Sequence, residues 1–239
     1  MTEILNAQRQ HWQEMFVKKP DMFGTEPSDP AQKAAEIFKK EDKTKILELG
    51  SGQGRDTFHF ARNGFQVSAL DYSDSAIAAI TDKAQRMGLS ASIAALQHDV
   101  RVPLPFDDDS FDGCYSHMLY CMALTSTDLE FLSSEVRRVL KLGGLNIYTV
   151  RNTHDPDYRT GIHRGEDMYE VGGFIVHFFS REKVAYLAKG YDLVSIDEFE
   201  EGRLPRKLFR VTLREKAYPY DDNHSGRQKN QVKKRLPTH

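Results

Sequence analysis

The first candidate for a functional site is a glycine-rich turn at residues 48–54, which read Glu-Leu-Gly-Ser-Gly-Gln-Gly. The turn follows a short apolar run and precedes a segment with helical spacing. Glycines at such a junction permit a tight turn and let backbone N–H groups approach a ligand with no Cβ in between. The usual ligand is nucleotide-like, and in an open α/β sheet it binds beyond the carboxyl ends of the strands. The sequence therefore predicts a ligand-binding loop at residues 48–54.

The spacing of these glycines distinguishes between classes of nucleotide. The dinucleotide pattern G-x-G-x-x-G would use Gly50 and Gly52 and needs a third glycine at position 55, where Arg55 stands. The phosphate-binding pattern G-x-x-x-x-G-K-[ST] also fails, because no Gly-Lys-Ser/Thr follows. An NAD(P)-dependent oxidoreductase is therefore an alternative that only the fold class supports. Of the loop residues, Arg55 is the one that we expect to face solvent.

Strand-like and helix-like segments alternate on either side of this loop. Strands are expected at residues 45–49, 65–70, 92–97, 111–116, 145–150, 191–199 and 207–214, and helices at residues 56–63, 73–87, 129–140 and 180–189. Ser73 is a suitable helix N-cap, and Gly143 and Gly144 are expected to end the third of these helices. The last two strands have no helix between them, which indicates an antiparallel pair. The order predicts a Rossmann-like, doubly wound α/β fold: a seven-stranded, mostly parallel sheet with an antiparallel last strand.

Composition restricts the classes of partner. The 239 residues are 39% hydrophobic and 28% charged with a net charge of -2, which is typical of a soluble globular protein and not of one that binds nucleic acid. Cys114 and Cys121 lie in no CxxC or Cys/His array, so we expect buried thiols and no metal. Neither a secretory signal nor an apolar run of about 18 residues is present, which predicts a cytoplasmic protein without a membrane partner. The sequence leaves the oligomeric state open.

Five segments occur in the order of a known family. They are residues 48–54, ALDYS around Asp71, LQHDV around Asp99, FDGCYSHMLY at residues 111–120 and RRVLKLGGLNIYTV at residues 137–150. With these motifs the chain resembles class I S-adenosylmethionine-dependent methyltransferases over roughly residues 40 to 215. The resemblance implies S-adenosylmethionine as the methyl donor and S-adenosylhomocysteine as the product. A catalytically silent methyltransferase-like domain that binds the cofactor or a partner is the other alternative.

The resemblance also implies roles for particular residues. Glu48 would approach the methionine moiety, Asp71 would accept both ribose hydroxyls, and Asp99 would read the adenine edge. A carboxylate suits two hydroxyl donors because it offers two acceptor oxygens. The complete expected cofactor set is Glu48, Gly50, Ser51, Gly52, Gly54, Asp71, Tyr72, Asp99, Val100, Ser116 and His117. The structural alternatives are a solvated Glu48, a helix-capping Asp71 and an ordinary turn aspartate at position 99.

The methyl acceptor is expected to bind beyond the fourth and fifth strands, under a polar insert at residues 151–173. A sulfonium carries its own activated methyl group, so the protein must mainly position the nucleophile, and a general base is optional. The candidate catalytic residues are His117, Tyr120, Arg151, His154, His163, Arg164 and His177. The insert could instead be a solvated loop, and His177, in the apolar segment GGFIVHFFS, is expected in the core, on an extra strand. No third ligand accompanies His154 and His163, so no metal site is expected.

The N-terminal segment adds a second resemblance, to small-molecule methyltransferases of the tellurite-resistance and thiopurine type. Trp12, Phe16, Phe23 and Gly24 stand where those relatives carry a segment that folds over the cofactor. The expected organisation is a helical cap at residues 1–40, the methyltransferase domain at residues 41–217 and a flexible basic tail at residues 218–239. The Asn/Asp-Pro-Pro-Tyr motif of enzymes that methylate amino groups of nucleic acids is replaced by SHMLY. A small-molecule acceptor is therefore expected.

Overall fold

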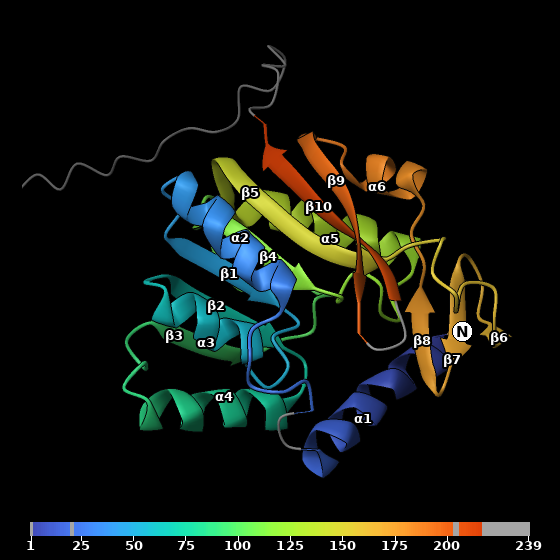
Figure 1. The fold of residues 1–239 in the computed structure, drawn as a ribbon, viewed down its shortest axis with the longest axis horizontal. Coiled ribbons are helices and arrows are strands. Elements are labelled where there is room, and N and C mark those ends of the chain that lie inside the picture. The colour runs from blue at the N-terminus through green and yellow to red at the C-terminus, as the bar shows by residue number, and fades with distance from the viewer. Residues whose placement is uncertain (1, 20–21, 203–205, 217–239) are drawn as a thin grey trace, which may run out of the picture.

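The computed structural model describes residues 2–19, 22–202 and 206–216, so the expected tail at residues 218–239 lies outside the described residues. In chain order the elements are α1 (Thr2–Lys18), α2 (Asp29–Lys40), β1 (Lys45–Leu49), α3 (Arg55–Arg62), β2 (Gln66–Asp71), α4 (Asp74–Arg86), β3 (Ile93–Gln97), β4 (Phe111–His117), α5 (Ser126–Val139), β5 (Leu140–Arg151), β6 (Ile162–His163), β7 (Met168–Val171), β8 (Phe174–His177), α6 (Arg181–Leu187), β9 (Tyr191–Glu201) and β10 (Arg206–Glu215) (Figure 1).

The main sheet has seven strands in the order β3-β2-β1-β4-β5-β10-β9. β1 pairs in parallel with β2 and with β4, so the strand order reverses between β1 and β4. β10 is antiparallel to both β5 and β9. The expected doubly wound fold with an antiparallel last strand is confirmed. In such a sheet the ligand site lies at the carboxyl ends of the strands where the order reverses.

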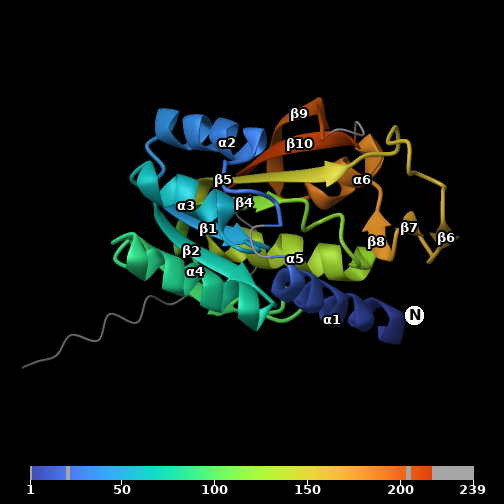
Figure 2. The same ribbon diagram turned by 60° about the horizontal axis from the view of Figure 1, so that its bottom comes forward.

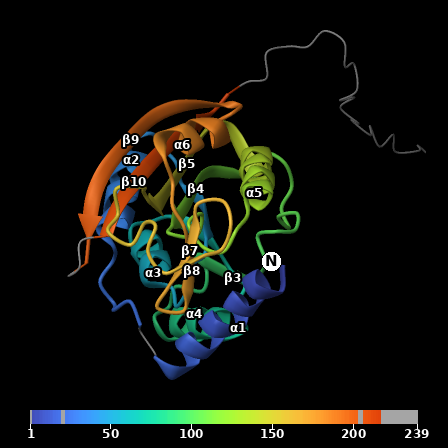
Figure 3. The ribbon, with the colours of Figure 1, turned by 90° about the vertical axis from the view of Figure 1, so that its right-hand side faces the viewer.

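Helices cover both faces of this sheet (Figure 3), and a hydrophobic cluster lies between the helices and the sheet on each face. In β1, Ile46 belongs to the cluster under α2, α3 and α4, whereas Leu47 and Leu49 belong to the cluster under α5 and α6. This alternation follows from the two-residue period of a strand. Because both faces of the sheet are buried, β1 is an almost continuous apolar run. Glu48 interrupts this run, so its burial needs a separate explanation.

The junction between α5 and β5 differs from the expectation. α5 ends at Val139, and β5 begins at Leu140 and continues through Gly143 and Gly144 with a register shift against β4. Gly143 has a φ of +73°, and a Cβ on Gly144 would lie 2.7 Å from the carbonyl oxygen of Lys141. The two glycines therefore form a bulge inside the strand and do not end the helix.

The polar insert is not a simple loop. Its strands β6 and β7 pair antiparallel with each other, and β7 also pairs antiparallel with β8, so that the three form a separate sheet in the order β6-β7-β8. β8 is the extra strand expected in GGFIVHFFS. Helix α1 runs from this small sheet toward α4 (Figures 1 and 2). The Gln8 side chain joins α1 to the small sheet, because its amide nitrogen donates to the Gly173 carbonyl at 3.1 Å and its oxygen accepts from the Ile175 N–H at 3.1 Å.

Candidate active site

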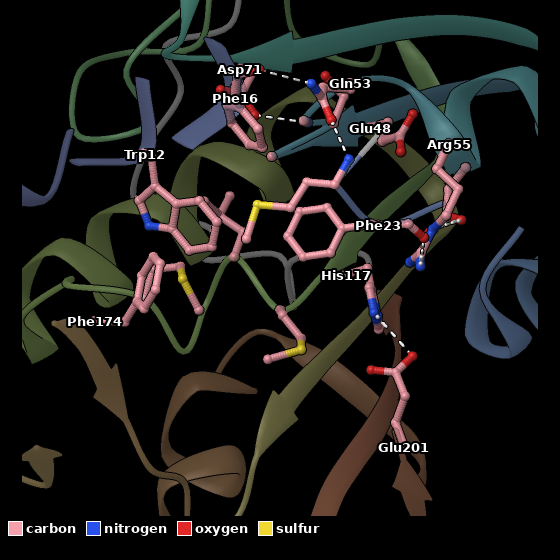
Figure 4. Close-up of a pocket in the computed structure, with 18 of the residues that line it drawn as sticks. Trp12, Phe16, Phe23, Glu48, Gln53, Arg55, Asp71, His117, Phe174 and Glu201 are labelled. Carbon is pink, nitrogen blue, oxygen red and sulfur yellow. Dashed lines mark hydrogen bonds and ion pairs between the residues drawn. The ribbon is translucent and has the colours of Figure 1, made fainter. Parts of the chain in front are cut away.

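A cavity of about 310 Å³ lies at the carboxyl ends of β1, β4 and β5 (Figure 4). The glycine turn after β1 and residues after β4 form its floor, while α1 and the β7–β8 hairpin contribute side chains from above. Within the described residues, no group of three or more His, Cys, Asp or Glu side chains is arranged to hold a metal ion. The helices among these residues include none that is long and apolar enough to span a bilayer.

The glycine turn has the expected conformation, but several of its N–H groups donate hydrogen bonds within the protein and not toward the cavity. Gly50, Gly52 and Gly54 all have positive φ, and a Cβ on Gly54 would lie 2.8 Å from Cγ1 of Ile80. The N–H groups are already engaged within the protein: those of Gly50 and Ser51 donate to the carbonyl oxygen of residue 70, that of Gly52 to Asp71, and that of Gly54 to Ser51. At these four positions the N–H groups donate within the protein, and the cofactor-binding role of the turn stays a prediction. A pyrophosphate is normally held by such donors, so this geometry does not favour a dinucleotide.

Asp71, the last residue of β2, lines the cavity and is 6% exposed. Its Oδ2 accepts the Gly52 N–H at 2.8 Å and its Oδ1 accepts the Ser73 N–H at 2.9 Å. Burial raises the pKa of Asp71, and these backbone hydrogen bonds oppose that rise. Each carboxylate oxygen keeps a further lone pair. Asp71 can therefore organise the glycine turn and accept two hydroxyl donors from a ligand.

Glu48 is a buried carboxyl group in the wall of the same cavity. The Thr57 hydroxyl donates to its Oε2 at 2.6 Å. Burial, together with the nearby Asp56 carboxylate, raises the pKa of Glu48 to about 8. Without a ligand the group is therefore mostly protonated at neutral pH, which explains how it is tolerated within an apolar strand. A cationic ligand group beside it would favour the charged form.

The raised pKa of Glu48 gives a prediction for stability. From its ordinary value of 4.5 up to about 8, the folded protein holds a proton that the unfolded chain releases, so stability falls as the pH rises through this window. The slope from one such group is at most about 1.4 kcal/mol per pH unit. Glu48→Gln keeps the shape and an acceptor for Thr57 but does not titrate. We expect the melting temperature of the wild type to fall more steeply from pH 5 to pH 8 than that of Glu48→Gln. Glu200→Gln, at an exposed position, should follow the wild type, and equal slopes for all three proteins would contradict the prediction.

Asp99 and Val100 line a smaller adjoining cavity of about 50 Å³. Tyr72, like Trp12, lines both cavities. The Asp99 carboxylate is held by Arg101, whose Nε and Nη2 lie 3.0 and 2.7 Å from its oxygens. The adenine role of Asp99 stays a prediction.

Two serines of the expected cofactor set have hydroxyl groups with no hydrogen-bond partner among the described residues. Ser51 lines the large cavity, so its hydroxyl is placed to meet a ligand. Ser116 is completely buried in β4 and lines neither cavity, so its role also stays a prediction.

Aromatic rings from three segments meet at the cavity wall (Figure 4). The Trp12 ring of α1 lies with its centroid 4.7 Å from Phe174 of β8, 5.7 Å from Phe16 and 6.2 Å from Phe23. All four residues line the cavity. The expected proximity of the N-terminal aromatic residues to the site therefore agrees with the geometry, and Phe174 is an addition that the sequence did not suggest.

The side chain of Gln53 joins the glycine turn to the N-terminal segment by hydrogen bonds. Its Oε1 accepts the Met22 N–H at 2.9 Å, and its Nε2 donates to the carbonyl oxygens of Phe16 and Lys19 at 3.1 and 3.2 Å. This residue of the turn thus binds backbone groups on both sides of the end of α1. Sequence reasoning gave Gln53 no role, because its partners lie about 35 positions away in the chain.

Arg55 was expected to face solvent, but it lies in the wall of the cavity. Its side chain is 21% exposed and lines the cavity, with Nε 3.2 Å from Asp56 and Nη1 3.3 Å from the Phe23 carbonyl oxygen. Asp56 also accepts hydrogen bonds from the Ser28 N–H and hydroxyl at 2.8 and 2.7 Å. Burial opposes the charged form of Asp56, but Arg55, His117 and the Ser28 hydrogen bonds together lower its pKa. Arg55 thereby belongs to a buried ionic cluster that supports the turn.

His117, the last residue of β4, lines the cavity opposite the glycine turn. Its Nδ1 lies 2.8 Å from the Thr149 hydroxyl, and its Nε2 lies 3.3 Å from Oε1 of Glu201. Glu201 ends β9, which runs parallel to β5, so both strands deliver their last residues to the same edge of the sheet. Glu201 was not expected from the sequence. The available signal was its position two residues after the predicted strand at residues 191–199.

Of the insert residues proposed as catalytic, only Arg151 lines the cavity. Its guanidinium is buried, and it pairs with Asp155 and Asp157. The other three face away: His154 is exposed beside Glu198, His163 contacts the carbonyl oxygen of Glu166 at 2.8 Å, and Arg164 pairs with Glu170.

Two further candidates lie in the core. Tyr120 is buried and stacks on Tyr148 with centroids 4.4 Å apart. His177 is completely buried, with Nδ1 2.7 Å from the carbonyl oxygen of Leu124 and Nε2 in contact with Lys183. Burial lowers the pKa of His177, with Lys183 acting in the same direction. His177 is the core residue that its apolar surroundings predicted, and of the seven candidates only His117 and Arg151 line the cavity.

Comparisons with known proteins agree with this geometry. Residues 46–144 match a family model described as a methyltransferase domain. The chain is 31% identical over 102 residues to a sterol 24-C-methyltransferase of Gibberella zeae, covering 42% of this chain and 26% of that protein. It is 25% identical over 205 residues to 24-methylenesterol C-methyltransferase 2 of Arabidopsis thaliana, covering 77% and 54%. The chain thus spans only part of the length of these curated relatives.

Solved structures give the same fold. The 1,6-didemethyltoxoflavin-N1-methyltransferase of Burkholderia thailandensis, solved with 1,6-didemethyltoxoflavin and S-adenosylhomocysteine, superimposes with a TM-score of 0.70 at 17% identity over 90% of each chain. TehB of Haemophilus influenzae superimposes with a TM-score of 0.64 at 17% identity, covering 86% of this chain and 67% of that one. Residues 46–144 therefore match the methyltransferase-domain family, and the chain shares the fold of these solved methyltransferases.

Proposed function

We propose that this protein transfers a methyl group from S-adenosylmethionine to a small-molecule acceptor. The observation that carries the proposal is the cavity at the reversal of strand order, with Asp71 and Glu48 in its wall and a glycine turn in which the N–H groups of Gly50, Ser51, Gly52 and Gly54 already donate within the protein. Such a cavity fits a ligand that has ribose hydroxyls and a positive charge but no phosphate. The methyltransferase-domain match over residues 46–144 supports the same assignment.

The residues of the cavity suit the different parts of this cofactor, which supplies an activated methyl group on a sulfonium. Asp71 would accept the ribose hydroxyls, and the carboxyl of Glu48 would lie near the cationic methionine moiety. The rings of Trp12 and Phe23 offer aromatic faces, which attract cations. Tyr72 lines both cavities, and the adenine would lie beyond it in the smaller cavity, near Asp99.

The acceptor would bind at the end of the cavity opposite Asp71, which we name the acceptor end and define by His117, Met118, Phe174, Val176 and Glu201. Three of these side chains are apolar and two are polar. The β7–β8 hairpin and α1 would cover this end and exclude water, as was expected of the insert and the N-terminal segment. The sterol and toxoflavin methyltransferases among the similar proteins are named for small molecules, which supports the acceptor class.

A thermal melt with S-adenosylhomocysteine, with NAD and without ligand tests the cofactor assignment. A ligand at 100 times its dissociation constant stabilises the folded state by about 2.7 kcal/mol. For a chain of this length we expect the midpoint to rise by roughly 5–10 °C with S-adenosylhomocysteine and to stay unchanged with NAD. A shift with NAD alone would support the oxidoreductase alternative, and no shift with either ligand would leave a silent domain as the better interpretation.

A further inference from the structure

The carboxylate of Glu201 has a fixed place at the acceptor end, where the imidazole of His117 holds one of its oxygens (Figure 4). Nε2 of His117 lies 3.3 Å from Oε1 of Glu201, and both side chains line the cavity. Burial opposes the charged form of Glu201, but the hydrogen bond from His117 lowers its pKa, and the positive charges of Arg55 and Arg206 act in the same direction. Glu201 is therefore a carboxylate at neutral pH that accepts the Nε2–H of His117.

The hydrogen bonds behind this pair all run in one direction. An imidazole whose Nε2 carries the hydrogen has its lone pair on Nδ1. Nδ1 of His117 lies 2.8 Å from the Thr149 hydroxyl, which therefore donates to it. The Thr149 hydroxyl oxygen in turn accepts the N–H of Met118 at 3.0 Å. Each hydrogen of this chain points toward Glu201, so the carboxylate is the last acceptor of the chain.

The backbone after β4 keeps the chain of hydrogen bonds in place. Met118 has a φ of +63°, in the left-handed region that residues other than glycine rarely adopt. Its N–H donates to both the carbonyl oxygen and the hydroxyl of Thr149, at 3.1 and 3.0 Å. Such a conformation persists where the surrounding contacts determine it, and it is frequent at ligand sites. The imidazole of His117, and with it Oε1 of Glu201, is thereby fixed in the cavity wall.

The second carboxylate oxygen of Glu201, Oε2, is open to a ligand. Among the described residues no group donates a hydrogen bond to it, and the side chain is 27% exposed. Figure 4 shows this oxygen turned away from His117. The other side chains of the acceptor end, those of Met118, Phe174 and Val176, carry no N–H or O–H. Because the Nε2–H of His117 is already used, the acceptor end presents lone pairs and apolar surface to a ligand, and no free side-chain donor.

We propose that Oε2 of Glu201 accepts a hydrogen bond from the methyl acceptor and thereby selects it. The acceptor class is a small molecule with an apolar body and an N–H or O–H group. A molecule that offers only lone pairs at this position binds less well, because two acceptor atoms would then face each other with neither satisfied. The inference rests on the proposed function and adds to it a residue that determines specificity.

A calorimetric titration tests the donor site without knowledge of the natural acceptor. Protein saturated with S-adenosylhomocysteine is titrated with 2-naphthol, which has an O–H donor, and with 2-methoxynaphthalene, whose oxygen is only an acceptor. A hydrogen bond to a charged group corresponds to about tenfold or more in affinity, so we expect the wild type to prefer 2-naphthol by at least this factor. The probes also differ in size by one methyl group, and the change of their affinity ratio between variants removes this difference.

Glu201→Gln tests the direction of the hydrogen bond. The amide oxygen can keep the Nε2–H of His117, which places the NH₂ group where Oε2 was. We therefore expect this variant to lose the preference for 2-naphthol and to bind 2-methoxynaphthalene more tightly than the wild type does. Glu201→Leu should lose the preference without that gain. Glu200→Gln, at an exposed position of the same strand, is the matched control and should keep the wild-type ratio.

The inference would be overturned by a wild type that binds both probes equally, or neither, while S-adenosylhomocysteine is bound. This comparison does not depend on the folding of any variant. An unchanged affinity ratio in Glu201→Gln would also overturn it. S-adenosylhomocysteine binding is measured in the same proteins: failure of the wild type to bind it would count against the proposed function. A loss of about tenfold or more in Glu201→Gln alone would instead place Glu201 at the cofactor and overturn only this inference.

Discussion

Asp71→Asn is expected to weaken S-adenosylhomocysteine binding by about 1.5–3 kcal/mol, a factor of roughly ten to more than one hundred. The wild-type carboxylate accepts the N–H of Gly52 with one oxygen and that of Ser73 with the other. An amide has only one acceptor oxygen, so its NH₂ group must face one of these two donors. The substitution therefore removes a ribose acceptor and also sets the amide NH₂ against one N–H donor, that of Gly52 or that of Ser73.

The matched control for Asp71→Asn is Asp82→Asn, which changes an exposed carboxylate on α4 that pairs with Arg86. We expect Asp82→Asn to bind S-adenosylhomocysteine like the wild type. Calorimetry below the melting temperature of all three proteins gives the affinities, and melts without ligand show how much the turn itself is destabilised. Wild-type affinity in Asp71→Asn would show that this residue organises the turn but does not contact the ribose.

The parts of the site that the sequence predicted are those encoded over short distances. Glu48 and Asp71 each stand at the end of a strand of the sheet, and the three glycines with positive φ between them identify the turn. The alternation of strands and helices predicts a parallel sheet, and a parallel sheet places the ends of β1, β2 and β4 along one edge. These inferences need no knowledge of which distant side chains meet.

The features that the sequence did not predict depend on long-range contacts. Glu201 reaches His117 only because β9 pairs with β10 and β10 with β5, an order that strand periodicity does not encode. Arg55 was expected in solvent because charged loop residues usually are, but Asp56 and the Phe23 carbonyl oxygen hold it at the cavity. The strands of the insert have only two and four residues, too few to show an alternating pattern.

Asp155→Ala is expected to destabilise the protein by about 3–5 kcal/mol, the cost of leaving a buried ion pair without one partner. The Asp155 side chain is completely buried and pairs with Arg151, which is itself 6% exposed. Its oxygens also accept the N–H groups of Asp157 and Lys207, each at 2.9 Å. Asp155 thus joins the end of β5, the start of the insert and the start of β10. For a chain of this length the melting temperature should fall by roughly 6–20 °C.

Asp157→Ala is the matched control, because Asp157 binds the same guanidinium of Arg151 at 2.6 Å but has a side chain that is 42% exposed. An exposed partner contributes little, so we expect a loss of less than about 1 kcal/mol. Arg151→Met combined with Asp155→Ala should recover part of the stability lost in Asp155→Ala, since no unpaired buried charge remains. Urea unfolding of the four proteins gives the free energies. Equal, small losses for the two single aspartate variants would show that Arg151 needs neither carboxylate, and Arg151 would then be free to contact the methyl acceptor, as its place in the cavity wall first suggests.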